Sequence, residues 1–250
     1  MRPASLLETT LSDHASIEAF NRPIPADLPT PYVEIDEERL MRNLKTMQQR
    51  ANQADVALRP HIKTHKNLAI AGRQLELGAI GVTASKPEEA LVFVEAGVPS
   101  VTIAYPIVRS ESIERLVKSA KVHQTELQFI AAHEMGIEAI GAAAQTYGVK
   151  LGVFLKIDVG LGRVGVKPKD PATIQLAEKI AHHPHLTFTG LLSHAGHSYG
   201  SKSVEQLTSI ANKEAQDLLE LAEKLKKSGI EVSHISVGAT PTCLGAAIPE

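Results

Sequence analysis

The sequence predicts an α/β fold in which parallel strands alternate with helices to form a (β/α) TIM-type barrel. Two observations predict this class. From Pro31 onward, short β-branched runs alternate with longer amphipathic stretches. One strand and one helix recur about every 25 residues, a spacing that favours a barrel over an open sheet. The composition, 43% hydrophobic and 22% charged, is that of an ordinary globular protein.

The first predicted unit has a strand over 32–35 and a helix over 37–50, with Asp36 as the helix N-cap. The remaining strands are expected at 56–59, 80–84, 101–105, 127–131, 151–157, 186–193 and 234–237. The remaining helices are expected at 67–77, 87–96, 111–120, 134–147, 171–183 and 203–228. Pro87 begins a helix well, and Gly148 stands where one should end. Counting 32–35 gives a closed eight-stranded barrel, and leaving it out gives seven strands, so both possibilities stay open.

Residues 1–29 are polar and rich in proline, and we interpret them as an N-terminal extension before one domain over 30–250. A formal net charge of −2 argues against a nucleic-acid partner. No apolar run is long enough for a membrane helix. The single cysteine, Cys243, excludes an internal disulfide and agrees with a cytoplasmic location.

The segment RPHIKTHK, residues 59–66, follows a predicted strand and precedes a predicted helix. In a barrel this position lies on the catalytic face. Five basic or potentially basic side chains in eight residues favour a bound anion and lower the pKa of a lysine toward nucleophilic use. Composition alone favours a basic loop that faces solvent, because charged loops are common.

The string RPHxKxHK, together with TPYVEID at 30–36, resembles the D-threonine aldolase and D-serine dehydratase family. That family is a branch of the alanine-racemase-like enzymes of pyridoxal 5′-phosphate. The resemblance covers residues 30–250. It implies a barrel of the alanine racemase N-terminal type, with Lys63 as the lysine that holds the cofactor as a Schiff base.

Three further segments resemble cofactor contacts of the same family. Residues 158–165 resemble a DxGxxRxG segment, which implies that Arg163 approaches the phenolic oxygen of the cofactor. Residues 194–199 resemble HxGxxY, which implies that His194 flanks the ring and Tyr199 meets the pyridine nitrogen. A metal site at His194 and His197 is the weaker alternative, and Tyr199 as packing at the barrel rim stays open.

Residues 236–242 resemble a phosphate-binding loop of the family, and Ala239 replaces its usual serine. Small-residue loops after late barrel strands commonly bind phosphate. We expect the backbone N–H groups of Gly238 and Ala239 and the hydroxyl of Thr240 to contact it. Tyr105, His61 and His65 are weaker candidates.

The resemblance implies a lyase that acts on D-3-hydroxy amino acids, as a dehydratase or an aldolase. Lys63, Arg163 and Tyr199 are the predicted catalytic residues. An amino-acid racemase, a non-catalytic protein of pyridoxal phosphate homeostasis, and a barrel for another phosphate ester are the alternatives.

Relatives use zinc or manganese, held by an HxC or HxD motif that does not follow Thr242 here. We therefore expect no metal site in this chain, and a metal only in a longer form. By the same resemblance we expect the last strand and the C-terminal β-domain to be absent, so that the barrel is incomplete at its C-terminus. The partners expected are a small-molecule substrate and a second copy in a homodimer.

Overall fold

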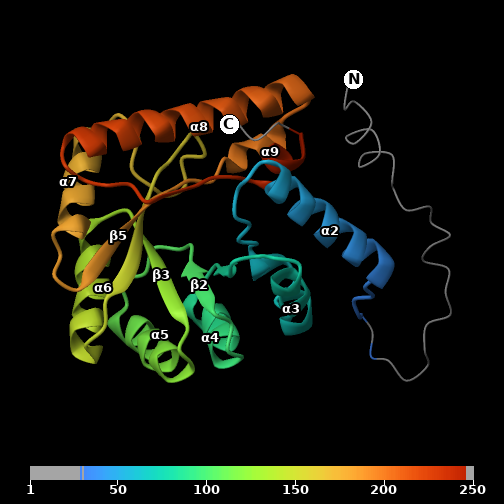
Figure 1. Ribbon diagram of the computed structural model, residues 1–250, viewed down its shortest axis with the longest axis horizontal. Helices are drawn as coiled ribbons and strands as arrows, with labels where there is room; N and C mark the ends of the chain where they lie inside the picture. Colours follow the sequence, from blue (N-terminus) through green and yellow to red (C-terminus); the bar gives the residue numbers. More distant parts are fainter. Residues whose placement is uncertain (1–28, 30, 246–250) are drawn as a thin grey trace.

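A computed structural model describes residue 29 and residues 31–245 of the 250-residue chain (Figure 1). Its parallel sheet runs in chain order through β1 (Val82–Ala84), β2 (Ser100–Ile103), β3 (Glu126–Ala131), β4 (Leu151–Lys156), β5 (Leu186–Leu192) and β6 (His234–Ser236). Its helices are α2 (Glu37–Gln53), α3 (Leu68–Glu76), α4 (Pro87–Glu95), α5 (Ser110–His123), α6 (Glu134–Tyr147), α7 (Pro171–Ala181), α8 (Val204–Lys227) and α9 (Thr240–Gly245). Two 3₁₀ helices, η2 (Ile62–Thr64) and η3 (Gly196–Gly200), follow strand-like segments.

Local signals in the sequence set the helix boundaries as predicted. The Asp36 carboxylate accepts the Arg39 backbone N–H at 2.9 Å and so caps α2. Helix α4 begins with Pro87, followed by two acidic residues in its first turn. Helix α6 ends at Gly148, whose φ of 61° is the left-handed conformation that glycine adopts without strain.

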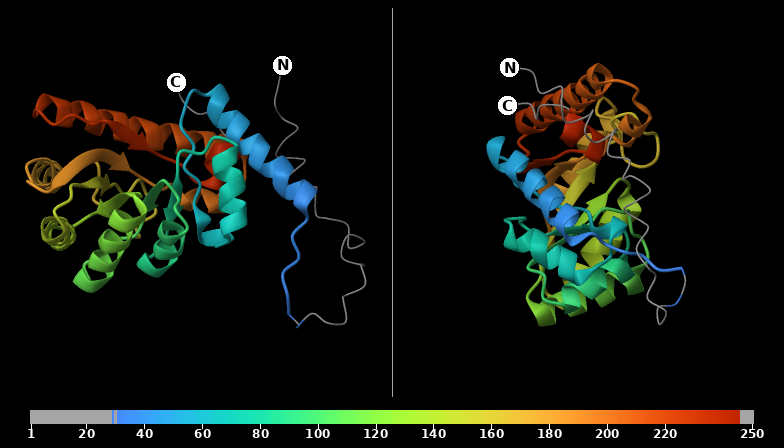
Figure 2. Two further views of the ribbon diagram at one scale, coloured as in Figure 1. Left: turned by 60° about the horizontal axis from the view of Figure 1, so that its bottom comes forward. Right: turned by 90° about the vertical axis from the view of Figure 1, so that its right-hand side faces the viewer.

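The two faces of the sheet differ in character. One face packs against helices α4 to α7 and carries the main core, in which Ile103, Phe129 and Leu155 are fully buried. The other face carries a separate small apolar cluster of Ile130, Phe154 and Leu192. Because side chains alternate along a strand, Lys156 shares this second face with Phe154. Helix α8 adds Leu218, Leu221 and Leu225 to the main core, and Figure 2 shows the sheet curled with the helices outside it.

The strand predicted at 32–35 is absent from the structure. These residues lack strand structure and are exposed, and Val33 is 88% accessible. A β-branched run forms a strand only where a neighbouring strand accepts its hydrogen bonds, and no described strand lies beside this one.

The predicted strand at 56–59 is also not assigned as a strand, although it runs beside β1. Ile80 donates its N–H to the Leu58 carbonyl at 3.0 Å, and Thr83 donates to Pro60 at 2.8 Å. A parallel bridge joins His61 to Thr83. Pro60 has no N–H to donate, so the ladder cannot continue through it.

The result is a curled parallel sheet with helices outside, part of a TIM-type barrel. Among the described residues no strand pair joins β6 back to the 58–61 segment. A side chain links these regions instead, because Arg50 near the end of α2 donates to the Cys243 carbonyl of α9 at 3.1 Å. The predicted extension, residues 1–29, lies outside the described part of the chain except for Pro29. None of the helices in the described ranges is long and apolar enough to cross a membrane.

Candidate functional site

The four segments singled out in the sequence all follow strands or the strand-like segment beside β1. Lys63 lies in η2, Arg163 in the loop after β4, His194 directly after β5, and Gly238 in the turn after β6. Because parallel strands end at the same edge of a sheet, these loops gather at one end of the curled sheet. The structure therefore places the four segments at one end of the sheet, and their role as a site stays a prediction.

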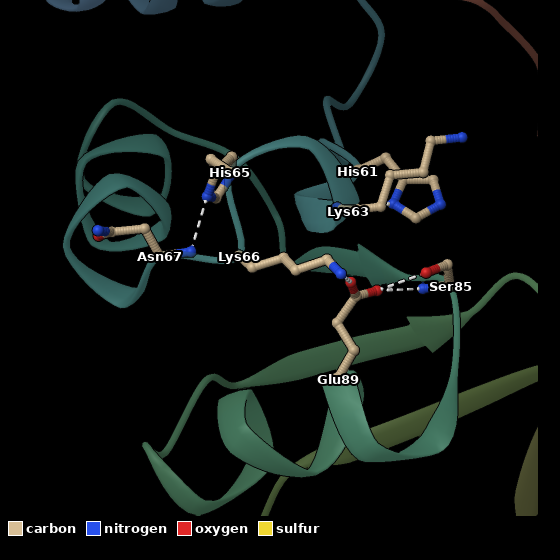
Figure 3. A network of polar contacts seen from close by, with 7 residues as sticks. All are labelled: His61, Lys63, His65, Lys66, Asn67, Ser85 and Glu89. Carbon is tan, nitrogen blue, oxygen red and sulfur yellow. Dashed lines mark hydrogen bonds and ion pairs between the residues drawn. The ribbon is translucent and has the colours of Figure 1, made fainter. Parts of the chain in front are cut away.

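Figure 3 shows the loop that carries Lys63. The Lys63 side chain is exposed, and no hydrogen bond or ion pair within the described residues engages its amine. Lys66, in contrast, bends back with a φ of 49° and its amine lies 3.8 Å from a Glu89 carboxylate oxygen. One lysine of the loop is thus held against the protein, and the other is available for chemistry.

Glu89 anchors this loop to the start of α4. Its carboxylate accepts the Ser85 backbone N–H at 2.6 Å and the Ser85 hydroxyl at 2.8 Å. Burial would raise the pKa of Glu89, but the two Ser85 bonds and Lys66 hold it below its ordinary value. The carboxylate is therefore a fixed negative charge beneath the Lys63 loop.

His61 lies beside Lys63 and is neutral at physiological pH. Its Nδ1 accepts the Lys63 backbone N–H at 3.3 Å. Burial, followed by the positive charge of Lys63, lowers the pKa of His61 to about 4. His65 acts on the backbone instead, since its Nδ1 accepts the Asn67 N–H at 3.1 Å near the start of α3.

Arg163 lies in the loop after β4, whose two ends are joined by hydrogen bonds. Val166 donates to the Lys156 carbonyl and Asp158 donates to the Val166 carbonyl, both at 2.9 Å, so the two ends of the loop are paired. The Asp158 carboxylate accepts the N–H groups of Gly160 at 3.1 Å and Gly162 at 3.0 Å. A Cβ on Gly165 would lie 2.6 Å from the Asp158 nitrogen, so this return of the chain requires glycine. The Arg163 side chain is exposed.

His194 interacts with groups from three of the other predicted segments. Burial lowers its pKa, and the charges of Lys156, Lys63 and Arg163 lower it further, against the effect of the Gly238 carbonyl. Its Nδ1 lies 3.1 Å from that carbonyl oxygen. A carbonyl only accepts, so Nδ1 carries the proton and Nε2 is left as an acceptor. The positive charges of Lys63 and Arg163 thus both act on His194.

The other predicted residues lie at the same end of the sheet but are less closely tied to this group. Tyr199, in η3, is 65% exposed, and no hydrogen bond within the described residues links it to Lys63 or Arg163. Tyr105 is exposed after β2. The ring contacts predicted for Tyr199 stay a prediction.

The predicted phosphate loop differs from the expectation in one respect. The Gly238 N–H faces the Glu214 carboxylate, and the Ala239 N–H donates to the Thr242 hydroxyl at 3.0 Å. The Ala239 donor is engaged within the protein, and the Gly238 donor faces a carboxylate, because the turn leads directly into α9. Thr240 keeps an exposed side chain at the start of that helix. Phosphate binding by this turn remains a prediction.

Two buried ionisable residues of the site were missed in the sequence. Lys156, at the end of β4, is 4% exposed, and burial lowers its pKa to about 8. Glu214, on α8, is 3% exposed, and burial raises its pKa. A lysine ending the apolar run LGVFLK could have been noticed. Glu214 also had a signal, because it shares the buried face of α8 with Leu207, Leu218 and Leu221, where a charged residue is unexpected.

Comparison with known proteins agrees with this geometry. The family described as "Alanine racemase, N-terminal domain" matches residues 35–249. D-threo-3-hydroxyaspartate dehydratase of Delftia sp. (strain HT23) is 33% identical over 221 residues, which are 88% of this chain and 57% of that protein. D-serine dehydratase of Dictyostelium discoideum is 29% identical over 227 residues, covering 87% of this chain and 57% of that protein.

A solved structure, D-threonine aldolase from Filomicrobium marinum, superposes with a TM-score of 0.80 at 29% identity. The superposition covers 88% of this chain and 61% of that one. The chain therefore spans little more than half the length of these relatives.

Proposed function

The chain belongs to the family of alanine racemase N-terminal domains, and from this premise we propose that it forms the pyridoxal phosphate-binding part of a lyase. The substrates would be D-3-hydroxy amino acids, as the names of its relatives suggest. One observation carries the proposal. An unengaged primary amine, Lys63, lies in a loop at the carboxyl end of a parallel sheet, near two histidines held neutral, one of which also feels the charge of Arg163.

The side chains present fit this cofactor. Its aldehyde requires a primary amine, which Lys63 supplies, and its phenolic oxygen requires a cation, which Arg163 supplies. Buried polar atoms without partners among the described residues, His197 Nδ1, Ser198 Oγ and Ser201 Oγ, lie in or beside η3. Buried polar groups normally have partners, so these atoms agree with a polar ligand at this end of the sheet.

When bound, the cofactor would supply an electron sink that acidifies the α-hydrogen of an amino acid. Lys63 would hold the aldehyde carbon in the resting protein and, once displaced by substrate, would move a proton at the substrate α-carbon. Its neighbours would keep the amine reactive, since His61 is neutral and Lys66 is held by Glu89. His194 would flank the ring, Tyr199 would meet the pyridine nitrogen, and Thr240 would bind the phosphate.

The metal of the longer relatives does not fit the residues described. No group of three or more histidine, cysteine, aspartate or glutamate side chains within residues 31–245 could hold an ion. We therefore assign no step of this chain to a metal. Loss of hydroxide from the substrate would need an acid or a metal that a longer form supplies.

Reconstitution with the cofactor tests the central claim. The purified chain, incubated with pyridoxal phosphate, should develop an absorbance band near ~420 nm that borohydride abolishes. Mass spectrometry of the reduced protein should place the added group on Lys63. The Lys63→Ala variant should show no band. Lys66→Met, in the same loop, should keep it, since Lys66 contacts Glu89 rather than the open site. A colourless wild-type mixture, or a label on Lys66, would contradict the proposal.

Product analysis then distinguishes the reactions. With D-serine and zinc present, a dehydratase forms pyruvate and ammonia. An aldolase releases an aldehyde and glycine from D-threonine. Inversion of the substrate without either product would favour the racemase alternative. Cofactor binding with none of these activities would favour a non-catalytic carrier.

We also propose that the protein acts as a homodimer in the cytoplasm, with a small-molecule substrate and no nucleic-acid or membrane partner. The single Cys243 and the net charge of −2 support the location and the choice of partner. Sedimentation equilibrium tests the dimer, and a monomer at micromolar concentration would contradict it.

A further inference from the structure

A buried carboxylate on α8 connects two of the segments proposed to bind the cofactor. The Ser193 hydroxyl, at the end of β5, donates to a Glu214 carboxylate oxygen at 2.5 Å. The Gly238 backbone N–H faces the same carboxylate. Glu214 itself lies more than a full turn inside the 24-residue α8, so it caps no helix end.

These contacts form a closed circuit around His194. Ser193 precedes His194 in the chain and its N–H donates to the Ser236 carbonyl at 2.9 Å. The His194 Nδ1 contacts the Gly238 carbonyl at 3.1 Å. Glu214 therefore accepts a hydrogen bond from the residue before His194 and faces the N–H of the residue that fixes the His194 tautomer. It is the one member of the circuit that comes from a helix rather than from a strand end.

The cost of burying this carboxylate argues for a role beyond packing. A buried charge is destabilising unless it is paired, and an apolar side chain of similar size would fill the space more cheaply. Glu214 has the additional charge of Lys156 nearby, although no ion pair within 4.0 Å joins the two. A buried charged residue that lowers the stability of the fold usually belongs to a functional site.

We propose that Glu214 is a positioning residue, which holds the His194 imidazole and the Gly238 turn in the geometry that receives pyridoxal phosphate. This inference rests on the proposed function. It adds that affinity for the cofactor depends on a residue of α8 that does not itself contact the cofactor. Its effect passes through Ser193 and Gly238, which it holds in fixed positions.

The helix offers a matched control. Asp217, three residues further along α8, is also a buried carboxylate, and it accepts from Lys213 at 2.7 Å. Its partner lies on the same helix, away from the strand ends. Asp217→Asn therefore disturbs α8 to a similar degree without touching the circuit.

The experiment compares cofactor affinity and folding stability in four proteins: wild type, Glu214→Leu, Glu214→Gln and Asp217→Asn. Affinity is measured by titrating pyridoxal phosphate and following the band near ~420 nm, and stability by urea unfolding without the cofactor. Glu214→Leu should weaken binding by about tenfold or more. Glu214→Gln, which keeps one accepting oxygen, should recover part of the loss. Asp217→Asn should bind as the wild type does.

Equal affinity of Glu214→Leu and wild type would overturn the inference, as would an equal loss in Asp217→Asn. If the leucine variant does not fold, Glu214→Gln decides, because unchanged affinity there would also contradict a positioning role. Failure of the proposed function is distinguishable, since the wild type itself would then show no band. A wild type that binds through Lys63, with unaffected Glu214 variants, would reject this inference alone.

Discussion

The two ends of the sheet differ in how fully their polar side chains are hydrogen-bonded. At the amino end, polar groups pair with one another. Arg59 donates to the Ser100 hydroxyl at 2.9 Å, and Ser100 donates to Glu126 at 2.8 Å. Gln128 donates to the other Glu126 oxygen at 3.1 Å and accepts from the buried Thr102 hydroxyl at 2.8 Å. None of these five residues has a buried polar atom without a partner.

At the carboxyl end, buried polar groups are left under-satisfied. Lys156 is 4% exposed and has no hydrogen bond or ion pair among the described residues. Glu89 keeps a buried Oε1 without a hydrogen bond, 3.8 Å from the Lys66 amine. His61 and His194 are held neutral by burial and by nearby cations. The comparison teaches that one end contributes stability, whereas the other loses stability to keep groups that can act on a ligand.

The largest expected effect is at the amino end. Gln128→Leu should lower the free energy of unfolding by about 2–3 kcal/mol, because it leaves the fully buried Thr102 hydroxyl without an acceptor. Urea unfolding measures the loss. The double variant with Thr102→Val should recover part of it, since both partners are then apolar. Strictly additive losses would show that the pair is not coupled.

At the carboxyl end the opposite sign is expected. Lys156→Met should raise the free energy of unfolding by about 1–2 kcal/mol at pH 7, because it removes a buried amine without a partner. Lys150→Met, an exposed lysine just before the same strand, is the matched control and should change little. A destabilised Lys156→Met protein would mean that the two ends do not differ as described.

The pH dependence of that gain has a defined direction. Burial lowers the pKa of Lys156 from 10.5 to about 8, so between these values the unfolded chain binds a proton that the folded chain does not. Wild-type stability therefore rises with pH across this interval. The advantage of Lys156→Met should be complete below pH 8 and should shrink from pH 8 toward 10.5.

The smallest expected effect concerns His61. Its pKa is lowered from 6.5 to about 4, so the unfolded chain takes up a proton first as the pH falls. Wild-type stability should decrease between pH 6.5 and 4. His61→Gln should reduce that decrease by about 1 kcal/mol or less at pH 5.5, measured by urea unfolding. The same substitution at the exposed His123 is the control. If His61→Gln lost as much unfolding free energy between pH 6.5 and 4 as the wild type does, His61 would not be neutral in the folded protein.

Alternating patterns predicted most of the fold. All seven predicted helices exist, and the strands from β1 to β6 lie within a few residues of the predicted ranges. The errors came from residues whose state depends on a neighbour. Val33 has strand propensity but no adjacent strand, and Pro60 interrupts a ladder that its neighbours begin. The short helix α9 was also missed, because its small residues resemble a loop.

Site residues were predictable only where they belong to a short sequence motif. Lys63, Arg163 and His194 were singled out in this way, and the charges of the first two act on His194 in the structure. Glu214 lies 20 residues beyond His194 on an amphipathic helix, so its contact with Ser193 depends on how α8 packs. Likewise, the sequence could not reveal that Asp158 organises its loop through the N–H groups of Gly160 and Gly162.

The small cluster of Ile130, Phe154 and Leu192 lies between these two ends on the inner face of the sheet. Hydrocarbon cannot relay a proton, so no chain of hydrogen bonds can run along this face from Gln128 to Lys156. Gln128 and Lys156 are therefore separated along this face by side chains that can neither donate nor accept a hydrogen bond.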